Sequence, residues 1–302
     1  MNGLSNTIKT WTLLAALGGL LIAVGGLLGG RSGLLIALLF AVVMNVVVYW
    51  KSDTIALKAN GARELRLGEA PRLRQIVTSL ASRSGLPVPR LYIIDRPEPN
   101  AFATGRDPEH AAVAVTSGIL DLMDERQLTG VLAHELSHVK NRDTLVGTIA
   151  ATIAGAISYL AQIAQFQMLF GGREDRGGGN AIGELAAIIL APIAALIIQL
   201  AVSRGREYGA DASGAMLTRD PEALAEALER LEAANKQSGF FARLGGRVPG
   251  RGQPQQAPNP AFATLYIVNP LSGRELGGLF STHPPVAERV ERLRSMRISG
   301  AA

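Results

Sequence analysis

The sequence predicts a mainly α-helical protein with a small β-sheet (α+β) and several membrane-spanning helices. Three observations lead to this fold class. Hydrophobic residues make up 48% of the 302 residues, and charged residues make up only 18%. Several uncharged stretches approach the roughly 20 residues that cross a bilayer core. Short apolar strands and amphipathic helical patterns fill the rest of the chain.

The composition limits the chemistry that the chain can perform. It contains no cysteine, so disulfides and thiolate metal sites are excluded, and a metal would need histidine and carboxylate ligands. The net charge of +5 is modest, and arginines gather near the apolar stretches. Because no basic stretch is interleaved with aromatic residues, we expect the lipid bilayer as a partner and no nucleic acid.

Residues 1–50 are predicted to form an N-terminal transmembrane hairpin. The stretches 11–30 and 33–50 are uncharged, and Arg31 and Ser32 separate them. Each stretch is close to the length that crosses a bilayer. The first is not a typical cleaved signal peptide, because its apolar core is long and a second span follows at once.

Residues 144–203 are predicted to form a second hydrophobic hairpin. The stretches 144–172 and 185–203 are uncharged, and the charged loop "GGREDRGGGN" joins them. This hairpin either crosses the bilayer or lies buried and only dips into lipid. Basic residues flank both hairpins on the side of the large polar regions, so the positive-inside rule places those regions in the cytoplasm.

The two remaining regions, 51–143 and 204–302, are predicted to form one soluble α+β domain. Asp124 and Gln127 have the spacing of a capping box, which predicts that a helix begins there and runs through His138. A stretch rich in Gly, Pro, Gln and Arg predicts a flexible loop at 236–260. The other predicted elements are helix 70–84, strands 91–95 and 111–118, helix 210–234 with a break near Asp220, and helix 285–297.

The motif "VLAHELSHVK" (131–140) places two histidines four residues apart on the predicted helix. Positions i and i+4 share one face, so His134 and His138 can bind one zinc ion together. Glu135 points about 100° away and can lean over an open coordination position as a general base. This is the HExxH pattern of zinc metallopeptidases, which predicts a zincin-type catalytic domain.

A catalytic zinc needs a third protein ligand and one open position. His110 lies in a charged loop and is expected to be a surface residue, whereas His283 stays a candidate. Glu207 is the better candidate because it follows the fourth apolar stretch at a helical position. Asp211 lies four residues further on the same face, where it can accept a hydrogen bond from a ligating histidine. Alternatively, both acids are solvated charges at a helix end beside Arg206.

Four motifs in this order resemble the HtpX family: "NAFATG", "HELSHVKNRD", "SRGREYGAD" and "LFSTHPPVAERVERL". HtpX proteins are membrane-bound zinc metallopeptidases of bacteria and archaea, related to the CAAX prenyl proteases. The resemblance covers nearly the whole chain, including both hairpins. It implies a multi-pass protein of the inner membrane with its catalytic site on the cytoplasmic side.

The resemblance also implies roles for the motif residues at the metal. One Zn²⁺ per chain would be held by His134, His138 and Glu207. Glu135 would be the catalytic base and acid, and Asp211 would support a ligand. His283 would lie near the zinc and steady the oxyanion of the tetrahedral intermediate.

Residues that bind the substrate are implied as well. Asn100, Ala101 and Phe102 resemble the active-site edge strand of thermolysin-like enzymes, which would pair with an extended peptide. Asn100 would contact the substrate backbone or the leaving amine, although it could instead be a turn residue after Pro99. Arg289 would bind a substrate carboxylate or serve a structural role.

The implied function is a zinc metalloendopeptidase (hydrolase) for protein quality control in the stress response. It would cleave misfolded or damaged membrane proteins from the cytoplasmic side. The alternatives are a prenyl-protein (CAAX-type) protease, whose relatives have more spans, and a catalytically inactive membrane scaffold. An intramembrane protease is disfavoured because Arg126 and Lys140 bracket the motif too closely for a bilayer span. A metal transporter would need polar ligands inside the spans.

Overall fold

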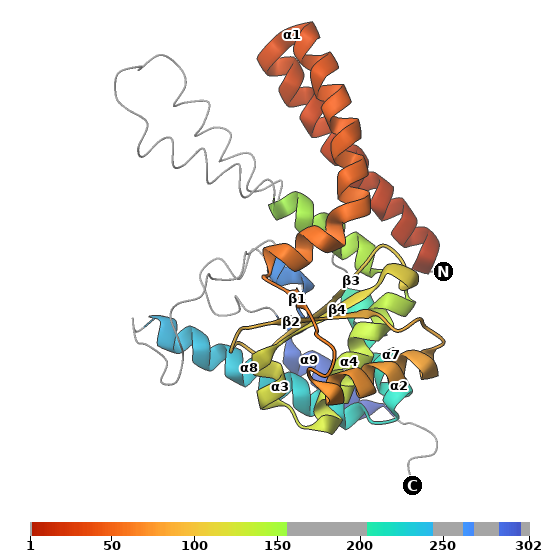
Figure 1. Ribbon diagram of the computed structural model, residues 1–302, viewed down its shortest axis with the longest axis vertical. Helices are drawn as coiled ribbons and strands as arrows, with labels where there is room; N and C mark the ends of the chain where they lie inside the picture. The colour runs from red at the N-terminus through yellow and green to blue at the C-terminus, as the bar shows by residue number, and fades with distance from the viewer. Residues whose placement is uncertain (1, 156–203, 244–261, 269–283, 297–302) are drawn as a thin grey trace.

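The computed structural model describes residues 2–155, 204–243, 262–268 and 284–296 (Figure 1). Most of the predicted second hairpin, 156–203, lies outside the described residues. Its first part is described as an apolar helix, Thr144–Gly155. His283 and most of the predicted loop, 244–260, also lie outside them.

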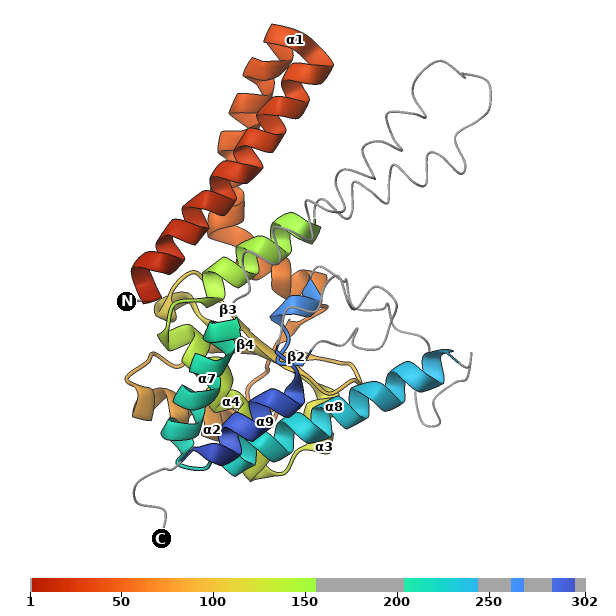
Figure 2. The same ribbon diagram turned by 180° about the vertical axis from the view of Figure 1, so that it is seen from behind.

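The N-terminal hairpin is one long helical element, α1 (Asn2–Ala59), whose helical geometry breaks at Gly30. Gly30 has φ 57° and ψ −138°, a conformation that glycine adopts without the steric cost of a side chain. Figures 1 and 2 show the two arms side by side, projecting away from the rest of the molecule. The turn therefore lies one residue before the predicted Arg31–Ser32 junction, and both arms run beyond the predicted spans.

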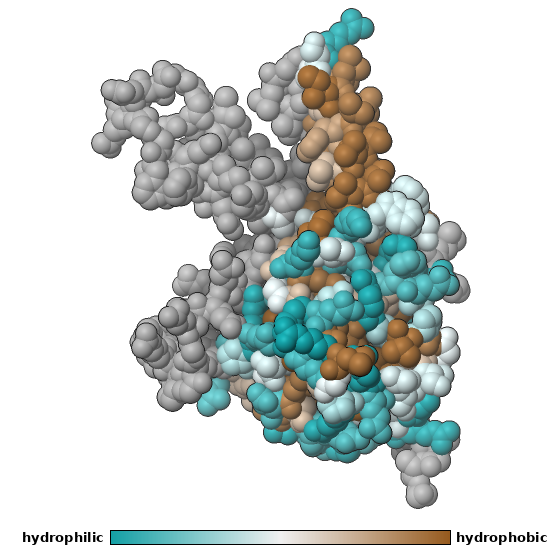
Figure 3. Space-filling view, viewed as in Figure 1, coloured by the Kyte–Doolittle hydropathy of each residue, from teal (hydrophilic) through white to brown (hydrophobic). Residues whose placement is uncertain are grey.

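Among the described residues, one stretch is long and apolar enough to cross a membrane, Gly30–Ala59, whose most apolar 18-residue window has a mean hydropathy of 2.4. Its outer face exposes large apolar side chains, including Ile36 and Leu39, which are 71% and 69% exposed. Figure 3 shows this face as a hydrophobic column above a mostly hydrophilic body. Several membrane-spanning helices were predicted, and the described residues contain this single strong candidate.

A four-stranded sheet forms the centre of the soluble domain, with strand order β1-β2-β4-β3. Strand β2 pairs parallel with β4, and β3 pairs antiparallel with β4, so β3 lies at an edge of the sheet. Predicted strands 91–95 and 111–118 correspond to β2 and β4. The strand bounds are β1 Arg63–Glu64, β2 Arg90–Ile94, β3 Ala101–Thr104 and β4 Ala112–Thr116.

Helices cover one face of the sheet and enclose the main hydrophobic core. Leu132 and Leu136 of α4, Leu73 of α2 and Leu228 of α8 are buried there in one cluster with Val115 of the sheet. Besides the apolar helix Thr144–Gly155, the described helical elements after α1 are α2 (Pro71–Ser84), η1 (Pro108–His110), α3 (Ser117–Leu122), α4 (Glu125–Lys140), α7 (Arg204–Thr218), α8 (Pro221–Arg243), η2 (Phe262–Leu265) and α9 (Val286–Ser295).

The local signals at the helix ends behave as predicted. The Asp124 carboxylate accepts a hydrogen bond from the Gln127 N–H at 2.8 Å and caps α4. The predicted helix 210–234 is interrupted where α7 ends and α8 begins at Pro221. The loop prediction was wrong for residues 236–243, which continue α8. Lys236 pairs there with Glu232 one turn earlier, at 2.9 Å, which favours the helix.

Glycines allow α4 to approach its neighbours closely. A Cβ atom on Gly214 of α7 would lie 2.9 Å from the backbone nitrogen of His134. A Cβ atom on Gly130 of α4 would lie 2.9 Å from the backbone nitrogen of Leu224 in α8. Carbon and nitrogen atoms do not pack at that distance, so only glycine fits at these contacts. The contact at Gly214 brings α7 against the motif half of α4.

Candidate metal centre

Helices α4 and α7 bring His134, His138 and Glu207 together. One ligand atom from each lies within 4.8 Å of the others. The Nε2 atoms of the two histidines are 3.1 Å apart. The Glu207 carboxylate oxygens lie 3.9 Å from His134 Nε2 and 3.8 Å from His138 Nε2. This is the group of three that the sequence motifs indicated.

Carboxylates lie behind both histidine rings and set their tautomers. His134 Nδ1 lies 2.9 Å from Asp211 Oδ1, although the approach is not collinear with the N–H bond. His138 Nδ1 lies 3.0 Å from Asp143 Oδ1. A nitrogen that faces a carboxylate carries the proton, so in the neutral form of each ring Nε2 presents a lone pair. Both lone pairs point into the space beside Glu207.

This donor set fits a divalent cation. Two lone pairs 3.1 Å apart beside a carboxylate repel one another unless a positive charge lies between them. Two imidazole nitrogens on one tetrahedral zinc, each at about 2.0–2.1 Å, would be roughly 3.3 Å apart. Two histidines and one glutamate also form a known catalytic zinc set that leaves a position open for water. His134, His138 and Glu207 would therefore hold the metal.

The electrostatics of the histidines also favour a cation. Burial lowers the pKa of His138, but the carboxylates of Asp143 and Glu207 outweigh burial and raise it to about 10. Burial lowers the pKa of His134, and Asp211 opposes this in part. The site thus stabilises positive charge in contact with its carboxylates.

A second set of contacts holds Asp211 in place. Arg289 of α9 is 1% exposed, and it donates two hydrogen bonds to the Asp211 carboxylate at 2.8 and 2.7 Å. Its Nη1 donates to the Ile267 carbonyl at 2.9 Å. This paired charge lowers the pKa of Asp211 to about 2, against the effect of burial. The structure thus pairs Arg289 with Asp211 and the Ile267 carbonyl, as expected from the structural alternative; the alternative of a substrate carboxylate stays a prediction.

Glu135 lies beside the metal ligands and bonds to the edge strand. Its Oε2 accepts a hydrogen bond from the Ala103 N–H at 2.8 Å, and the residue is 2% exposed. Burial raises the pKa of Glu135 to about 8. A buried carboxyl group with a pKa near neutrality can both accept and release a proton.

The remaining predicted residues have different environments. Asn100 is buried, and its Nδ2 donates to the Val268 carbonyl at 2.7 Å. Phe102 packs edge-to-face on Tyr266, on the sheet face away from α4. His110 is half-buried and contacts Asp107 and Arg106 in the loop between β3 and β4, away from the metal ligands.

Asp143 is a residue of the site that the sequence reasoning missed. It lies just after α4, where Arg142 has φ 56° and turns the chain back toward His138. Its signal in the sequence is a lone carboxylate at the start of an uncharged stretch. Burying such a charge requires a partner.

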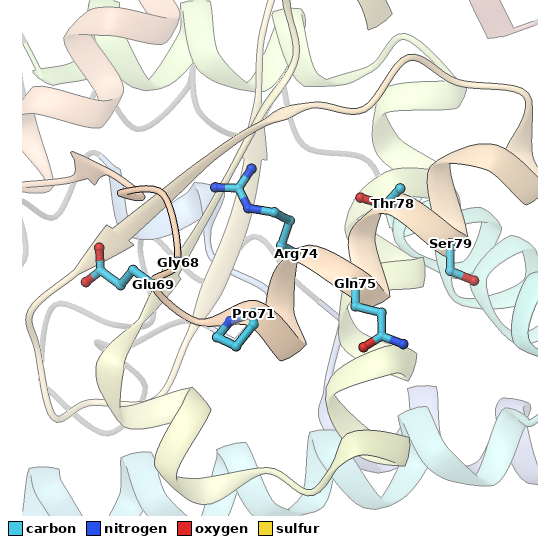
Figure 4. A pocket seen from close by; sticks show the side chains of 7 residues that line it. All are labelled: Gly68, Glu69, Pro71, Arg74, Gln75, Thr78 and Ser79. Carbon is cyan, nitrogen blue, oxygen red and sulfur yellow. The ribbon is translucent and has the colours of Figure 1, made fainter.

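A separate groove of about 490 Å³ lies along α2 (Figure 4). No metal ligand lines it, so it is distinct from the metal centre. Its lining residues are Gly68, Glu69, Pro71, Arg74, Gln75, Thr78 and Ser79.

The fold and the site together define a metal-dependent hydrolase with a HExxH helix, a glutamate ligand from a second helix and an edge strand. Comparison with known proteins gives the family. The model of peptidase family M48 matches residues 68–297. "Protease HtpX homolog" of Desulforapulum autotrophicum is 51% identical over 98% of this chain and 92% of its own length. That of Persephonella marina is 51% identical over 96% and 97%.

The chain therefore belongs to peptidase family M48 and, within it, to the HtpX group, and it is a metalloprotease. "Protease HtpX homolog" of Ralstonia pickettii is also similar, with 49% identity over 98% of both chains. Among solved structures, Ste24p of S. mikatae matches with a TM-score of 0.46 and 21% identity, over 97% of this chain and 66% of that one.

Proposed function

We propose that this chain is a membrane-integrated zinc endopeptidase that cleaves misfolded or damaged membrane proteins from the cytoplasmic side. The observation that carries the proposal is the position of Glu135. Its carboxylate bonds to the Ala103 N–H of the edge strand β3, and the residue follows the metal-binding His134 directly on α4. A peptide that pairs with β3 would have its backbone beside this carboxylate.

The residues of the chain divide the chemistry among them. Zinc, when bound by His134, His138 and Glu207, supplies a Lewis acid that polarises a peptide carbonyl and activates water. Glu135 takes the proton from the attacking water and delivers it to the leaving amine. Strand β3 holds the peptide in an extended conformation, and Asp211 and Asp143 keep the histidine rings oriented.

The location at a membrane is supported by the junction between the hairpin and the soluble domain. Trp11, Tyr49 and Trp50 form an aromatic cluster there, as is typical of membrane–water interfaces. Arg106, in the loop that follows β3, lies 4.6 Å over the Trp50 ring. The edge strand thus ends near the level of the predicted interface, where a damaged membrane protein would present unfolded segments.

The test compares wild type with Glu135→Gln, both purified in detergent without chelators. We expect each protein to hold about one zinc ion per chain, because Glu135 is not a ligand. We expect the variant to cleave unfolded casein roughly 10²–10⁴ times more slowly, which is the usual contribution of a general base. Bound zinc is measured by atomic absorption and cleavage by gel and mass spectrometry.

The matched control is Glu109→Gln, which removes an exposed glutamate in the loop between β3 and β4. It should match wild type in both measurements. If wild type holds zinc and cleaves no unfolded protein, the inactive-scaffold alternative is favoured. If it cleaves only prenylated peptides, the CAAX-type alternative is favoured.

A further inference from the structure

The segment Tyr266–Val268 lies along the outer edge of β3. The Ile267 N–H donates to the Ala101 carbonyl at 3.1 Å, and Tyr266 packs on Phe102 with ring centroids 5.2 Å apart. From Tyr266 to Ile267 the partner on β3 changes from Phe102 to Ala101, which is one residue earlier in the strand. The segment therefore runs antiparallel to β3. It occupies the position in which an added peptide strand would bind.

Two of the three backbone carbonyls of the segment accept hydrogen bonds from buried side chains of other elements. Arg289 Nη1 donates to the Ile267 carbonyl at 2.9 Å, and Asn100 Nδ2 donates to the Val268 carbonyl at 2.7 Å. These bonds contact only the backbone, so a peptide of another sequence could accept them equally. Arg289 also holds Asp211, and the segment is therefore bound by the same network that orients the metal ligand His134.

The pairing between the segment and β3 stops at the N-terminal end of the segment, next to the catalytic carboxylate of Glu135. If the same register continued, Leu265 would lie opposite Ala103. Leu265 instead belongs to the short helix η2 and does not pair with β3. The Ala103 N–H bonds instead to Glu135. A peptide that runs in the same direction would pass Glu135 first and Asn100 last. Residues in the positions of Tyr266–Val268 would therefore follow the bond that is cut.

The side chain of Ile267 shows what this position accommodates. It is 1% exposed and belongs to the main core cluster together with Val131 of α4 and Val290 of α9. An aliphatic pocket of this kind accepts a branched apolar side chain and disfavours a charged one.

We infer that Tyr266–Val268 is a resident pseudosubstrate, which fills the subsites for the residues that follow the scissile bond and which a substrate peptide must displace. This inference rests on the proposed endopeptidase function. The substrate segment that replaces it carries a branched aliphatic residue in the position of Ile267.

A reversible disulfide cross-link tests the inference. The chain has no native cysteine, so only the introduced cysteines can form the disulfide. Residues opposite one another in an antiparallel ladder have Cα atoms about 4.5–5.5 Å apart, within the range of a disulfide. The double variant Ala101→Cys/Ile267→Cys is built in the Glu135→Gln background, loaded with zinc, and compared in oxidised and reduced form. The readout is binding of fluorescent unfolded casein, which does not require cleavage.

We expect the oxidised form to bind casein at least about tenfold more weakly than the reduced form, with unchanged zinc content. Ala101→Cys and Ile267→Cys alone, treated with the same oxidant, should show no such change. Equal binding by the locked and reduced forms would overturn the inference, as would failure of the disulfide to form. A wild type that binds casein but never cleaves it would instead overturn the endopeptidase function.

A second measurement checks the pocket. The cut sites that wild type makes in unfolded casein are mapped by mass spectrometry. We expect enrichment of Ile, Val or Leu at one fixed position within the first two residues after the cut. A flat residue distribution at both positions would contradict the assigned pocket.

Discussion

At the residue scale, the site depends on a chain of contacts that begins at the metal ligands. His134 Nδ1 lies beside the Asp211 carboxylate, which accepts hydrogen bonds from Arg289. Arg289 also donates a hydrogen bond to the Ile267 carbonyl. Helical spacing pairs His134 with His138 on one helix and Glu207 with Asp211 on another, and the family resemblance implied their roles. Neither indicated the partners of Arg289, since these come from separate segments that meet only in the folded chain.

Asp143 offers a test at this scale. We expect Asp143→Asn to weaken zinc binding by roughly 10–100-fold, the usual effect of losing a carboxylate behind a ligating histidine. The physical reason is that His138 loses the acceptor that fixes its ring and its tautomer. Zinc affinity is measured by competition with a chelating dye. Asp121→Asn, at an exposed position in α3, is the control, and an equal loss there would contradict the assignment.

At the element scale, the approach of α7 to α4 decides where Glu207 lies. Neither helix carries all three ligands, so the site exists only when the two helices touch. Gly214 permits this contact because its missing side chain leaves room for the backbone of His134. Helix periodicity predicted each helix separately, but it contains no information on their separation.

We therefore expect Gly214→Ala to destabilise the protein by about 1–3 kcal/mol, the usual cost of overpacking. Zinc affinity should fall as well, because α7 must move away from α4 and take Glu207 with it. Thermal unfolding in detergent and zinc titration measure the two effects. Gly209→Ala is a matched control on the same helix, since a Cβ atom there would meet nothing within 4 Å. Identical behaviour of the two variants would contradict the packing argument.

At the scale of the whole molecule, the apolar hairpin and the soluble domain are joined through a shared contact region. Leu13, Leu14 and Val48 of α1 pack with Val146 and Ile149, which lie in the helix just after the zinc motif. Thr144 of that helix donates to the Gly105 carbonyl at 2.9 Å, next to the end of β3. The apolar hairpin thus packs against the helix that follows the zinc motif, and this helix is in turn bonded to the loop that follows β3.

The predicted orientation can be tested by labelling single cysteines in a chain that has none. We expect Ser32→Cys, near the turn of the hairpin, to react with a membrane-impermeant maleimide from outside the cytoplasmic membrane. We expect Ser295→Cys, at the end of α9, to react only after the membrane is opened, because the basic residues retain the large regions inside. The opposite labelling pattern would reverse the orientation and place the site outside the cytoplasm.

The sequence by itself determined the chemistry of this protein. The HExxH spacing, the capping signals and the apolar stretches follow from local periodicity, so the motif helix, the N-terminal hairpin and the metal ligand candidates could be predicted. Only the tertiary structure decided which distant residues meet. The Arg289 bond to Ile267 and the strand-like placement of Tyr266–Val268 depend on long-range packing, which local patterns do not encode. The Asp143 contact with His138 depends on the left-handed backbone turn at Arg142, which the helical pattern does not predict.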